Sequence, residues 1–533
     1  MPQYMPSTAD FVVVGAGSAG AAVAARLTER PRTSVVLFEA GGEDKDKFAH
    51  IPAGFNQLFE GANDWNYRTE PQPALAGRRI YWPRGKMLGG SSSMNAMMWV
   101  RGFAADYDEW AMHAGPGWSY ESVLPYFERM ATVEGGSQPG EGTEGPLHIS
   151  KQRSPRALTR DFLQAATEAG YAVERANGER PQGFTETMVT QKRGARWSTA
   201  DAYLRPALQR HRDLTVVTDA HVTRVVFDGN RAVGVEYRIG DETKIMYAKR
   251  EVILSAGAIN TPQLLMLSGI GHGEDLQELG IPVLHHNPAV GRRLRDHLAA
   301  PIVYRTRGGT LYGADKNLLE LGNYLLLRRG QLTSNIGEAY GFAHSKAQAG
   351  EDLGLPDLEL IFAPAPYVGE GLAEPDGHAI TLAAVLLKPE STGLVALTSP
   401  DPFTPPRIEP RYCTEAADRE ALLAGLQLCV NIANQPALKG HIGDIMQPPV
   451  PADTPMEEVL RRCLEDHSHT LYHPVGTCRM TSDDSGVVDP ELRVRGVEGL
   501  RIADTSVMPV ITRGHTHAPA VLIGEKAADL IAP

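Results

Sequence analysis

The amino-terminal part of the chain alternates short apolar runs with one helical segment. Residues 11–14 (FVVV) form the first apolar run, and residues 34–40 (SVVLFEA) form the second. Between them lies GAGSAG, followed by AAVAARLTERP, whose small and branched side chains are available for packing. This order predicts a strand, a helix and a second strand, joined by a right-handed crossover into one βαβ unit.

Farther along, the pattern predicts a meander and several helices. From residue 214 apolar and polar positions alternate, with Asp228-Gly229-Asn230 at one hairpin turn. Further strands are expected at 379–389 and 393–399, and helices at 158–170, 258–271 and 416–434. No repeat, low-complexity tract or linker divides the chain, so one nucleotide-binding body interrupted by inserts is expected.

One segment, residues 317–332, is unusually rich in leucine. It carries Leu318, Leu319, Leu321, Leu325 and Leu326 beside Tyr324. Such a segment could lie on a surface as an amphipathic helix, but we expect a helix that packs on its own domain.

Composition narrows the class of protein. The 533 residues are 42% hydrophobic and 22% charged, which is typical of a globular chain. The net charge of −12 gives no overall excess of basic residues that would attract nucleic acid or anionic lipid. The sequence contains no run of 18 apolar residues, so no membrane span is predicted. The start, MPQYMPSTAD, lacks a signal-peptide pattern, and four scattered cysteines without C-x-x-C indicate free thiols. We therefore predict a cytoplasmic α/β enzyme.

The first turn carries a dinucleotide fingerprint. Gly15, Gly17 and Gly20, with Ser18 among them, lie between the predicted strand and helix, and Glu39 and Ala40 end the second strand. The glycines permit a tight turn and close approach to a pyrophosphate, while a carboxylate accepts hydrogen bonds from ribose hydroxyls. The fingerprint alone does not separate NAD from FAD, and a tight βα turn with an exposed glutamate is the alternative.

Further blocks carry a family resemblance over essentially the whole chain. Residues 77–102 (GRRIYWPRGKMLGGSSSMNAMMWVRG) and 254–271 (LSAGAINTPQLLMLSGIG) resemble the two signatures of the glucose–methanol–choline (GMC) flavoprotein oxidoreductases. LYHPVGTCRM, VVDPELRVRGVEGLRIADTSVMP and HTHAPAVLIGEKAADLI follow in that family's order. The choline dehydrogenase and alcohol dehydrogenase branch is the most similar.

The resemblance implies an α/β fold with two discontinuous domains. A Rossmann-like FAD-binding domain would comprise residues 1–150, 213–300 and 481–533. A substrate-binding α+β domain with an antiparallel sheet would comprise residues 151–212 and 301–480. Positions that match the family's FAD contacts are Gly90, Ser91, Asn95, Ala96, Met97, Met98, Val222, Tyr472, Asp504, Thr505, Thr516 and His517.

Attachment of the flavin is expected to be non-covalent. Relatives that bind FAD covalently through the 90–98 tract carry a histidine at the position of Met94. Methionine cannot form that bond, and Met94 is equally consistent with a core side chain.

Two histidines match the family's catalytic positions. His473 would accept the hydroxyl proton of an alcohol while hydride passes to flavin N5, and His515 would orient the alkoxide. A helix beginning near Ala518 would place its positive dipole end at the flavin. Asp296-His297 is expected to give structural support beside the site. The metal-binding motif H-E-x-x-H does not occur, so no metal site is expected.

Glu338 is a candidate substrate-binding residue, because choline-handling relatives place an acid in this region; a salt-bridged glutamate is the alternative. The predicted function is oxidation of a primary alcohol to an aldehyde. The alternative is a lyase of the same fold, similar to hydroxynitrile lyases, without redox turnover. The sequence leaves open which alcohol is oxidised, whether oxygen or a quinone-like carrier reoxidises the flavin, and the oligomeric state.

Overall fold

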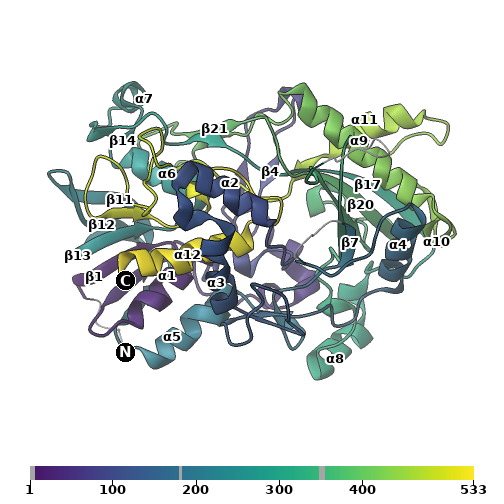
Figure 1. The fold of residues 1–533 in the computed structure, drawn as a ribbon, viewed down its shortest axis with the longest axis horizontal. Helices are drawn as coiled ribbons and strands as arrows, with labels where there is room; N and C mark the ends of the chain where they lie inside the picture. The colour runs from purple at the N-terminus through teal and green to yellow at the C-terminus, as the bar shows by residue number, and fades with distance from the viewer. Residues whose placement is uncertain (1–5, 179–182, 347–353, 533) are drawn as a thin grey trace.

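The computed structural model describes residues 6–178, 183–346 and 354–532. Two seven-stranded sheets organise the chain, and they lie at opposite ends of its longest axis (Figure 1). We call the part around the sheet at the left of Figure 1 the first body, and the part around the sheet at the right the second body. Residues 1–5, on which the expected lack of a signal peptide partly rests, lie outside the described residues.

The first sheet combines parallel strands with an antiparallel meander. Its order is β10-β2-β1-β13-β12-β11, with β25 paired to β13. The pairs β10/β2, β2/β1, β1/β13 and β13/β25 are parallel, while β12 is antiparallel to both of its neighbours. The strands are β1 (Thr8–Val14), β2 (Val35–Phe38), β10 (Leu214–Val217), β11 (His221–Asp228), β12 (Arg231–Ile239), β13 (Glu242–Leu254) and β25 (Leu500–Ile502).

The predicted βαβ unit is present at the centre of this sheet. Helix α1 (Ser18–Thr28) joins β1 to β2, and nearly all of its residues are buried. The apolar run at Phe11–Val14 is also buried, because parallel strands are covered on both faces. The predicted meander is β11–β12–β13, with its first hairpin at the expected Asp228–Arg231 turn.

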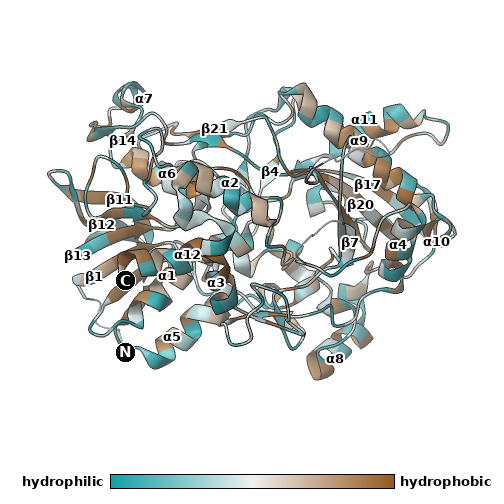
Figure 2. Ribbon diagram, viewed as in Figure 1, coloured by the Kyte–Doolittle hydropathy of each residue, from teal (hydrophilic) through white to brown (hydrophobic). Residues whose placement is uncertain are grey.

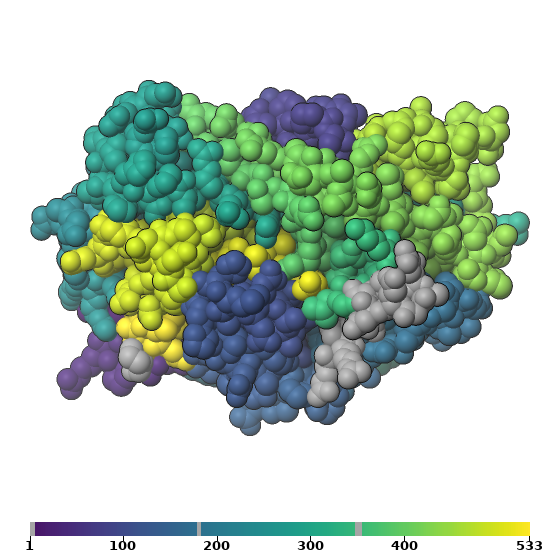
Figure 3. All heavy atoms as spheres, turned by 45° about the horizontal axis from the view of Figure 1, so that its top comes forward, coloured from purple at the N-terminus to yellow at the C-terminus, as the bar shows by residue number. Residues whose placement is uncertain are grey.

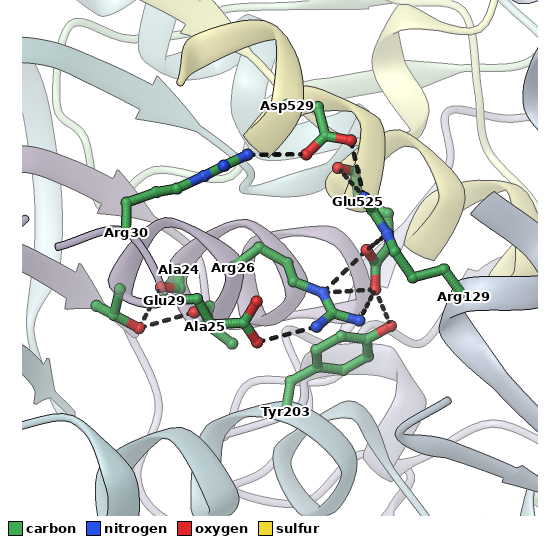
Figure 4. A network of polar contacts seen from close by, with 10 residues as sticks. Ala24, Ala25, Arg26, Glu29, Arg30, Arg129, Tyr203, Glu525 and Asp529 are labelled. Carbon is green, nitrogen blue, oxygen red and sulfur yellow. Dashed lines mark hydrogen bonds and ion pairs between the residues drawn. The ribbon is translucent and has the colours of Figure 1, made fainter. Parts of the chain in front are cut away.

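The last helix, α12 (His517–Ile531), is fixed against α1 by a buried carboxylate (Figure 4). Glu525 is fully buried and accepts hydrogen bonds from Arg26, Arg129 and the hydroxyl of Tyr203. These partners come from α1, from α3 (Tyr120–Met130) and from the turn at residues 200–204. A buried carboxylate is tolerated only with such partners, so the network holds the second half of α12 against α1 and α3.

The second body is built on an antiparallel sheet. Its order is β23-β17-β20-β19-β18-β7, with β24 paired to β17, and all of these pairs are antiparallel. Helices α4 (Ala157–Glu168), α9 (Ala416–Ala433) and α11 (Met456–His467) pack with it into one hydrophobic core. The strands are β7 (Gly183–Glu186), β17 (Leu298–Thr306), β18 (Ala339–Ala343), β19 (Leu358–Ala363), β20 (Ala379–Leu386), β23 (Ile442–Gln447) and β24 (His469–Thr470).

Shorter elements connect and cover the two bodies. The remaining helices are α2 (Ala104–Ala114), α5 (Arg205–Arg210), α6 (Gly257–Leu267), α7 (Gly273–Glu278), α8 (Leu318–Leu327) and α10 (Pro436–Lys439). The remaining strands are β3 (Tyr67–Arg68), β4 (Tyr81–Trp82), β5 (Ala131–Val133), β6 (Leu147–Ile149), β8 (Gln191–Lys192), β9 (Ala195–Arg196), β14 (Ile270–Gly271), β15 (His285–His286), β16 (Arg292–Leu294), β21 (Gly393–Ala396) and β22 (Arg407–Glu409).

The leucine-rich segment departs from expectation. Helix α8 forms there, but of its residues only Tyr324 is buried, and the outward face is hydrophobic (Figure 2). Five leucines of this helix are more than half exposed. The prediction that these leucines pack on the protein is therefore wrong, because the inner face of so short a helix holds only Tyr324 and Leu321 against the body.

The predicted fold class, an α/β body with an antiparallel second sheet, is confirmed. On the face shown in Figure 3, the C-terminal segment (yellow) lies beside the segment around residues 100–130 (blue), so distant stretches of sequence meet there. The domain boundaries remain a prediction. All four cysteines are buried free thiols, and none of the described helices is long and apolar enough to cross a membrane.

Candidate active site

A cavity begins at the carboxyl ends of the parallel strands and extends to the loops that face the second body. Its wall includes the ends of β1, β2 and β13, which is where open α/β sheets bind ligands. Nearly all of the predicted site residues line it: Gly15, Gly17, Ser18, Glu39, Ala40, Gly90, Ser91, Asn95, Ala96, Met97, Met98, Val222, Tyr472, His473, Asp504, Thr505, His515, Thr516 and His517. Gly20 and Glu338 do not.

Glycines bring two loops into close contact at one end of the cavity. Gly15 has a φ of +100°, and a Cβ there would collide with the carbonyl oxygen of Ser255. A Cβ on Gly20 would collide with the carbonyl of Gly15, so Gly20 acts in helix packing, away from the cavity. A Cβ on Gly90 would lie 2.7 Å from Cα of Gly17. The N-terminus of α1 has no side-chain cap and no acidic residue in its first turn, which suits a phosphate.

Glu39 closes the nucleotide end of the cavity. It is buried, and its carboxylate accepts hydrogen bonds from the backbone N–H groups of Ala16 and Gly41, each at 3.0 Å. Burial raises the pKa of Glu39 to about 7. The remaining lone pairs of this carboxylate can accept hydrogen bonds from hydroxyl groups, such as those of a ribose.

Asp504 shapes the middle of the wall through its own hydrogen bonds. Its carboxylate accepts from the N–H of Gly257 at 2.9 Å, the hydroxyl of Thr261 at 2.6 Å and the N–H of Ser506 at 2.8 Å. Burial raises the pKa of Asp504. The residue thus ties the start of α6 to the loop after β25, and both segments line the cavity.

Other wall residues are held in unusual backbone conformations. Met97 and Tyr472 have backbone φ values of +56° and +67°. Residues other than glycine rarely adopt this left-handed region without support from neighbouring contacts. Tyr472 is supported by a 2.6 Å hydroxyl contact with Tyr367, and its carbonyl accepts from Arg84 at 2.7 Å. Asn95 accepts from Arg196 at 2.7 Å.

His517 offers an unused hydrogen-bonding atom to the cavity. Its Nδ1 lies 3.1 Å from the hydroxyl of Ser18, while its Nε2 is buried without a partner. Burial lowers the pKa of His517 to about 4, so the ring is neutral near pH 7. A buried polar atom without a partner is costly, so its place in this wall fits a polar ligand group.

Two histidines face each other at the far end of the cavity. The rings of His473 and His515 are 4.8 Å apart between centroids, and both are buried. His515 Nε2 lies 3.1 Å from both oxygens of Glu359, a fully buried carboxylate on β19. A carboxylate accepts, so Nε2 of His515 donates and only Nδ1 is left for a ligand.

The tautomer of His473 follows from a chain of hydrogen bonds. His297 Nε2 lies 3.1 Å from the carbonyl oxygen of Leu387, which can only accept, so this nitrogen carries a proton. Burial lowers the pKa of His297 to about 3, so the ring is neutral and its Nδ1 is an acceptor. His473 Nδ1, 2.9 Å away, must then donate, which leaves a lone pair on Nε2 of His473.

The backbone around His473 is also held. Its N–H donates to Asp296 at 2.7 Å, and the same carboxylate accepts from Thr470 at 2.5 Å and from Tyr412. Burial, with the nearby imidazoles and Arg84 as further causes, lowers the pKa of His473 well below its usual value. An uncharged imidazole that keeps its one proton on Nδ1 and a fixed lone pair on Nε2 is suited to general-base chemistry.

Glu338 lies apart from the cavity. Its side chain is fully buried and accepts from the N–H of Arg156 at 2.7 Å, the hydroxyl of Thr159 at 2.6 Å and that of Ser334 at 2.6 Å. These bonds tie the start of α4 to the loop before β18. The structure gives Glu338 a structural position and does not bring it to the predicted substrate site.

Several wall residues and partners were not found from the sequence. Phe55, Phe59, Trp65 and Arg84 line the cavity, and Glu359 contacts His515. Glu359 had a detectable signal, because a charged residue interrupts the apolar strand LELIFA. The aromatic residues lie in a loop-rich region without periodicity, so no pattern indicated their position.

One group of potential metal ligands lies outside the cavity. Among the described residues, Asp44, His50 and Asp201 bring ligand atoms together. Arg205 forms ion pairs with both carboxylates, at 2.5 and 2.6 Å, and so already balances their charge.

Comparison with known proteins gives a consistent result. Family models described as GMC oxidoreductase match residues 9–299 and 389–524. The chain is 56% identical over 533 residues to an uncharacterised GMC-type oxidoreductase of Mycobacterium tuberculosis, which covers 99% of this chain and 100% of the relative. It is 40% identical over 538 residues to mitochondrial choline dehydrogenase of Mus musculus, with 98% and 89% covered.

Solved structures share the fold over nearly the whole chain. Pyridoxine 4-oxidase from Mesorbium loti has a TM-score of 0.88 at 31% identity, and 98% of each chain is covered. Formate oxidase of Aspergillus oryzae has a TM-score of 0.90 at 30% identity, and 99% of each chain is covered.

Proposed function

This chain belongs to the GMC oxidoreductase family, and we propose that it oxidises a primary alcohol to an aldehyde with FAD as the hydride acceptor and His473 as the general base. The family and its flavin-dependent members imply FAD. The observation that carries the proposal is the His297–His473 hydrogen bond, which leaves the Nε2 lone pair of His473 as the acceptor at the cavity.

The cavity wall fits FAD at both ends. Gly15, Gly17, Gly90 and the N-terminus of α1 would hold the pyrophosphate, and Glu39 the adenosine ribose. The 95–98 segment and His517 would hold the flavin, whose polar edge would give the buried His517 Nε2 its missing partner. Bound FAD supplies the acceptor for the hydride that leaves the carbinol carbon. Because position 94 is methionine, binding is non-covalent there.

The chain's own residues handle the proton. An alcohol hydroxyl within about 2.6–3.2 Å of His473 Nε2 can give its proton to that nitrogen. His297 holds the His473 ring in the tautomer that can accept it. Nε2 of His515 donates to the Glu359 carboxylate, which orients the ring, and we assign Nδ1 of His515 to hold the developing alkoxide.

Charge near His473 disfavours a cationic alcohol. Phe59 lies beside Tyr472 and Phe55 beside Phe59, with ring centroids 6.0 and 5.9 Å apart, but such rings contact neutral and cationic groups alike and do not decide the charge of the substrate. The cation of Arg84 lines the same end. Among the described residues, the only carboxylates in the cavity wall are Glu39, at the nucleotide end, and Asp504, in the middle of the wall, where its oxygens already accept hydrogen bonds from Gly257, Thr261 and Ser506. We infer that choline is a poorer substrate than uncharged primary alcohols.

Anaerobic addition of substrates tests the proposal. A panel of alkanols, aromatic alcohols, choline, pyridoxine and formate should include an uncharged alcohol that bleaches the flavin, with the matching aldehyde as product. A lyase of the same fold would cleave cyanohydrins and leave the flavin oxidised with every alcohol. Bleaching by formate alone would also contradict the proposal, because formate has no primary alcohol group.

Two accompanying proposals concern the setting of the reaction. Four free buried cysteines agree with a reducing, cytoplasmic compartment, since such thiols persist there. Reoxidation of the flavin by oxygen or by a quinone-like carrier is distinguished by turnover in air with and without an artificial dye acceptor.

A further inference from the structure

Helix α8 presents an apolar ridge to solvent. Leu318, Leu319 and Leu326 are 82%, 84% and 84% exposed, and Leu325 and Leu327 are 60% and 61% exposed. At 100° per residue these side chains occupy the outward half of the helix, and Tyr324 and Leu321 occupy the inward half. The usual amphipathic pattern of a surface helix is thus reversed, because here the polar solvent meets the leucines.

A row of cations without carboxylate partners lies against one end of this ridge; two of them, Lys192 and Arg328, lie over the rings of Trp197 and Tyr324. Arg328 and Arg329 follow the helix, Arg153 follows β6, and Lys192 and Arg193 lie on the β8–β9 hairpin; all five are exposed. Within the described part of the chain, none of them forms an ion pair with a carboxylate. The three segments are in contact, since Gly194 packs on Arg328 and Arg153, and the N–H of Gly330 donates to Ser154 at 3.1 Å.

We propose that the α8 ridge and these five cations form a docking surface for an anionic lipid membrane. Exposed leucines beside a basic rim match the chemistry of an interface that is apolar at acyl-chain depth and negative at the headgroups. The rim is local, because the chain as a whole carries −12. The negative charges on the same segment are Asp315 and Glu320, and Glu320 already accepts from the N–H of Gln331 at 2.9 Å.

Charge and shape favour a membrane over a second copy of the chain. In a two-fold contact through the ridge, the basic rims of both copies would meet at the edge of the interface, and like charges repel. A ridge one helix wide is also narrow for a stable dimer, which needs roughly 800 Å² from each partner. An interfacial helix needs only such a narrow strip of apolar side chains.

The position of the ridge relates it to the cavity. Tyr324 and Leu321, on the inner face of α8, pack on Ile51 and Ala53, and the hydroxyl of Tyr324 donates to the carbonyl of His50 at 3.2 Å. Ile51 precedes the 3-10 helix at residues 52–58 and Ala53 lies in it; Phe55 of the same short helix lines the cavity wall. Docking would therefore place a membrane on the outer face of α8, whose inner face packs on a segment of the cavity wall.

Vesicle flotation of the full-length, FAD-loaded protein tests the docking surface. The probes are vesicles of phosphatidylcholine alone and vesicles of phosphatidylcholine with an equal part of phosphatidylglycerol. Wild type should float with the anionic vesicles and stay below with the neutral ones. Leu319→Gln/Leu326→Gln should weaken binding at least tenfold, because two leucine side chains no longer enter the apolar layer. Arg328→Gln/Arg329→Gln should weaken it about 25-fold, at about fivefold for each basic residue near an anionic surface.

Matched controls carry the same chemistry elsewhere. Met112→Gln removes a side chain that is 77% exposed on α2, and Lys249→Gln removes an exposed cation on β13, in the first body; both should float like wild type. All variants should keep their FAD content and melting temperature.

Three results would overturn the proposal. The first is wild type that stays below with the anionic vesicles, and the second is a leucine variant that floats as well as wild type. The third is a dimer in sedimentation velocity that Leu319→Gln/Leu326→Gln converts to monomer, which would make the ridge a contact between copies.

Discussion

Replacing His473 by alanine removes the proposed base while leaving the cavity's other contacts in place. The phosphate-binding glycines, Glu39 and Asp504 lie on other segments, so FAD should remain bound. The N–H of residue 473 still donates to Asp296 in the variant, because that bond uses the backbone. The lost imidazole leaves His297 Nδ1 without its 2.9 Å partner, which should lower the free energy of unfolding by about 1–3 kcal/mol.

The kinetic cost should be larger than the stability cost. A positioned general base contributes roughly 10²–10⁴-fold to a rate, so anaerobic flavin reduction by a saturating alcohol should slow by that factor. This corresponds to about 2.7–5.4 kcal/mol of transition-state stabilisation. A water molecule in the space left by the ring could accept a hydrogen bond, but it is a far weaker base than imidazole, so little of the rate should return.

The pH profile separates a base from a merely structural residue. Burial lowers the pKa of His473 well below its usual value, so in wild type the lone pair is available throughout pH 6–9. A group with a lowered pKa loses its lone pair only as the pH falls through that pKa. Flavin reduction in wild type should therefore be flat over pH 6–9 and fall in more acid solution.

Stopped-flow bleaching of the flavin is the assay, and His469→Ala is the matched control. His469 is a buried histidine four residues away whose ring lies outside the cavity wall, so its loss should leave reduction within a few-fold of wild type. Reduction by His473→Ala within about threefold of wild type across pH 6–9, with FAD retained, would refute the assignment. His515 would then become the candidate base.

Four further changes follow from the same geometry. His297→Leu should slow flavin reduction about tenfold, because the lost acceptor no longer selects the His473 tautomer. His297→Gln should slow it less, because its amide can donate to Leu387 and accept from His473. Single-turnover rates compare the two variants, and equal slowing by both would contradict the tautomer argument. His515→Asn should retain more of the reduction rate than His515→Ala, since an amide N–H can still donate; the opposite order in the same assay would contradict the donor role. Acid precipitation should release yellow FAD into the supernatant, because Met94 cannot form a covalent link, and colour in the pellet would show a bond through another residue. Glu525→Leu should lower the free energy of unfolding by about 3 kcal/mol, since Arg26 and Arg129 lose a shared buried partner. Urea denaturation measures this loss, with Glu29→Leu, an exposed member of the same cluster, as the control. Equal losses in the two variants would contradict a special contribution of the buried carboxylate.

Much of the nucleotide half could be predicted because its signals are local. The turn at Gly15–Gly20 must adopt its conformation wherever a strand feeds a closely packed helix, and the acid at Glu39 follows at a fixed distance along the chain. Blocks such as 77–102 and 471–480 carried the remaining wall residues through family resemblance. The structure then places these distant segments around one cavity.

What the sequence could not decide concerns residues whose role depends on three-dimensional neighbours. For Glu338 the sequence left a substrate contact and a structural role open, and only the folded structure shows that Thr159 and Ser334 satisfy its carboxylate. The leucines of α8 were expected to be buried because apolar side chains usually are. Nothing in a linear pattern reveals that the inner face of this helix has room for Tyr324 and little else.

The environments of the two cavity histidines give them different roles although both are buried imidazoles. His473 contacts a neutral ring, His297, whose only free atom toward it is an acceptor, so His473 presents a lone pair to the cavity. His515 donates its Nε2–H to the carboxylate of Glu359, so its ring is held in place and Nδ1 is the nitrogen left for the substrate. With ring centroids 4.8 Å apart, His473 is placed to take the proton of a hydroxyl and His515 to hold its oxygen. The assignment of roles therefore comes from the hydrogen-bond partners His297 and Glu359 and not from the burial that the two imidazoles share.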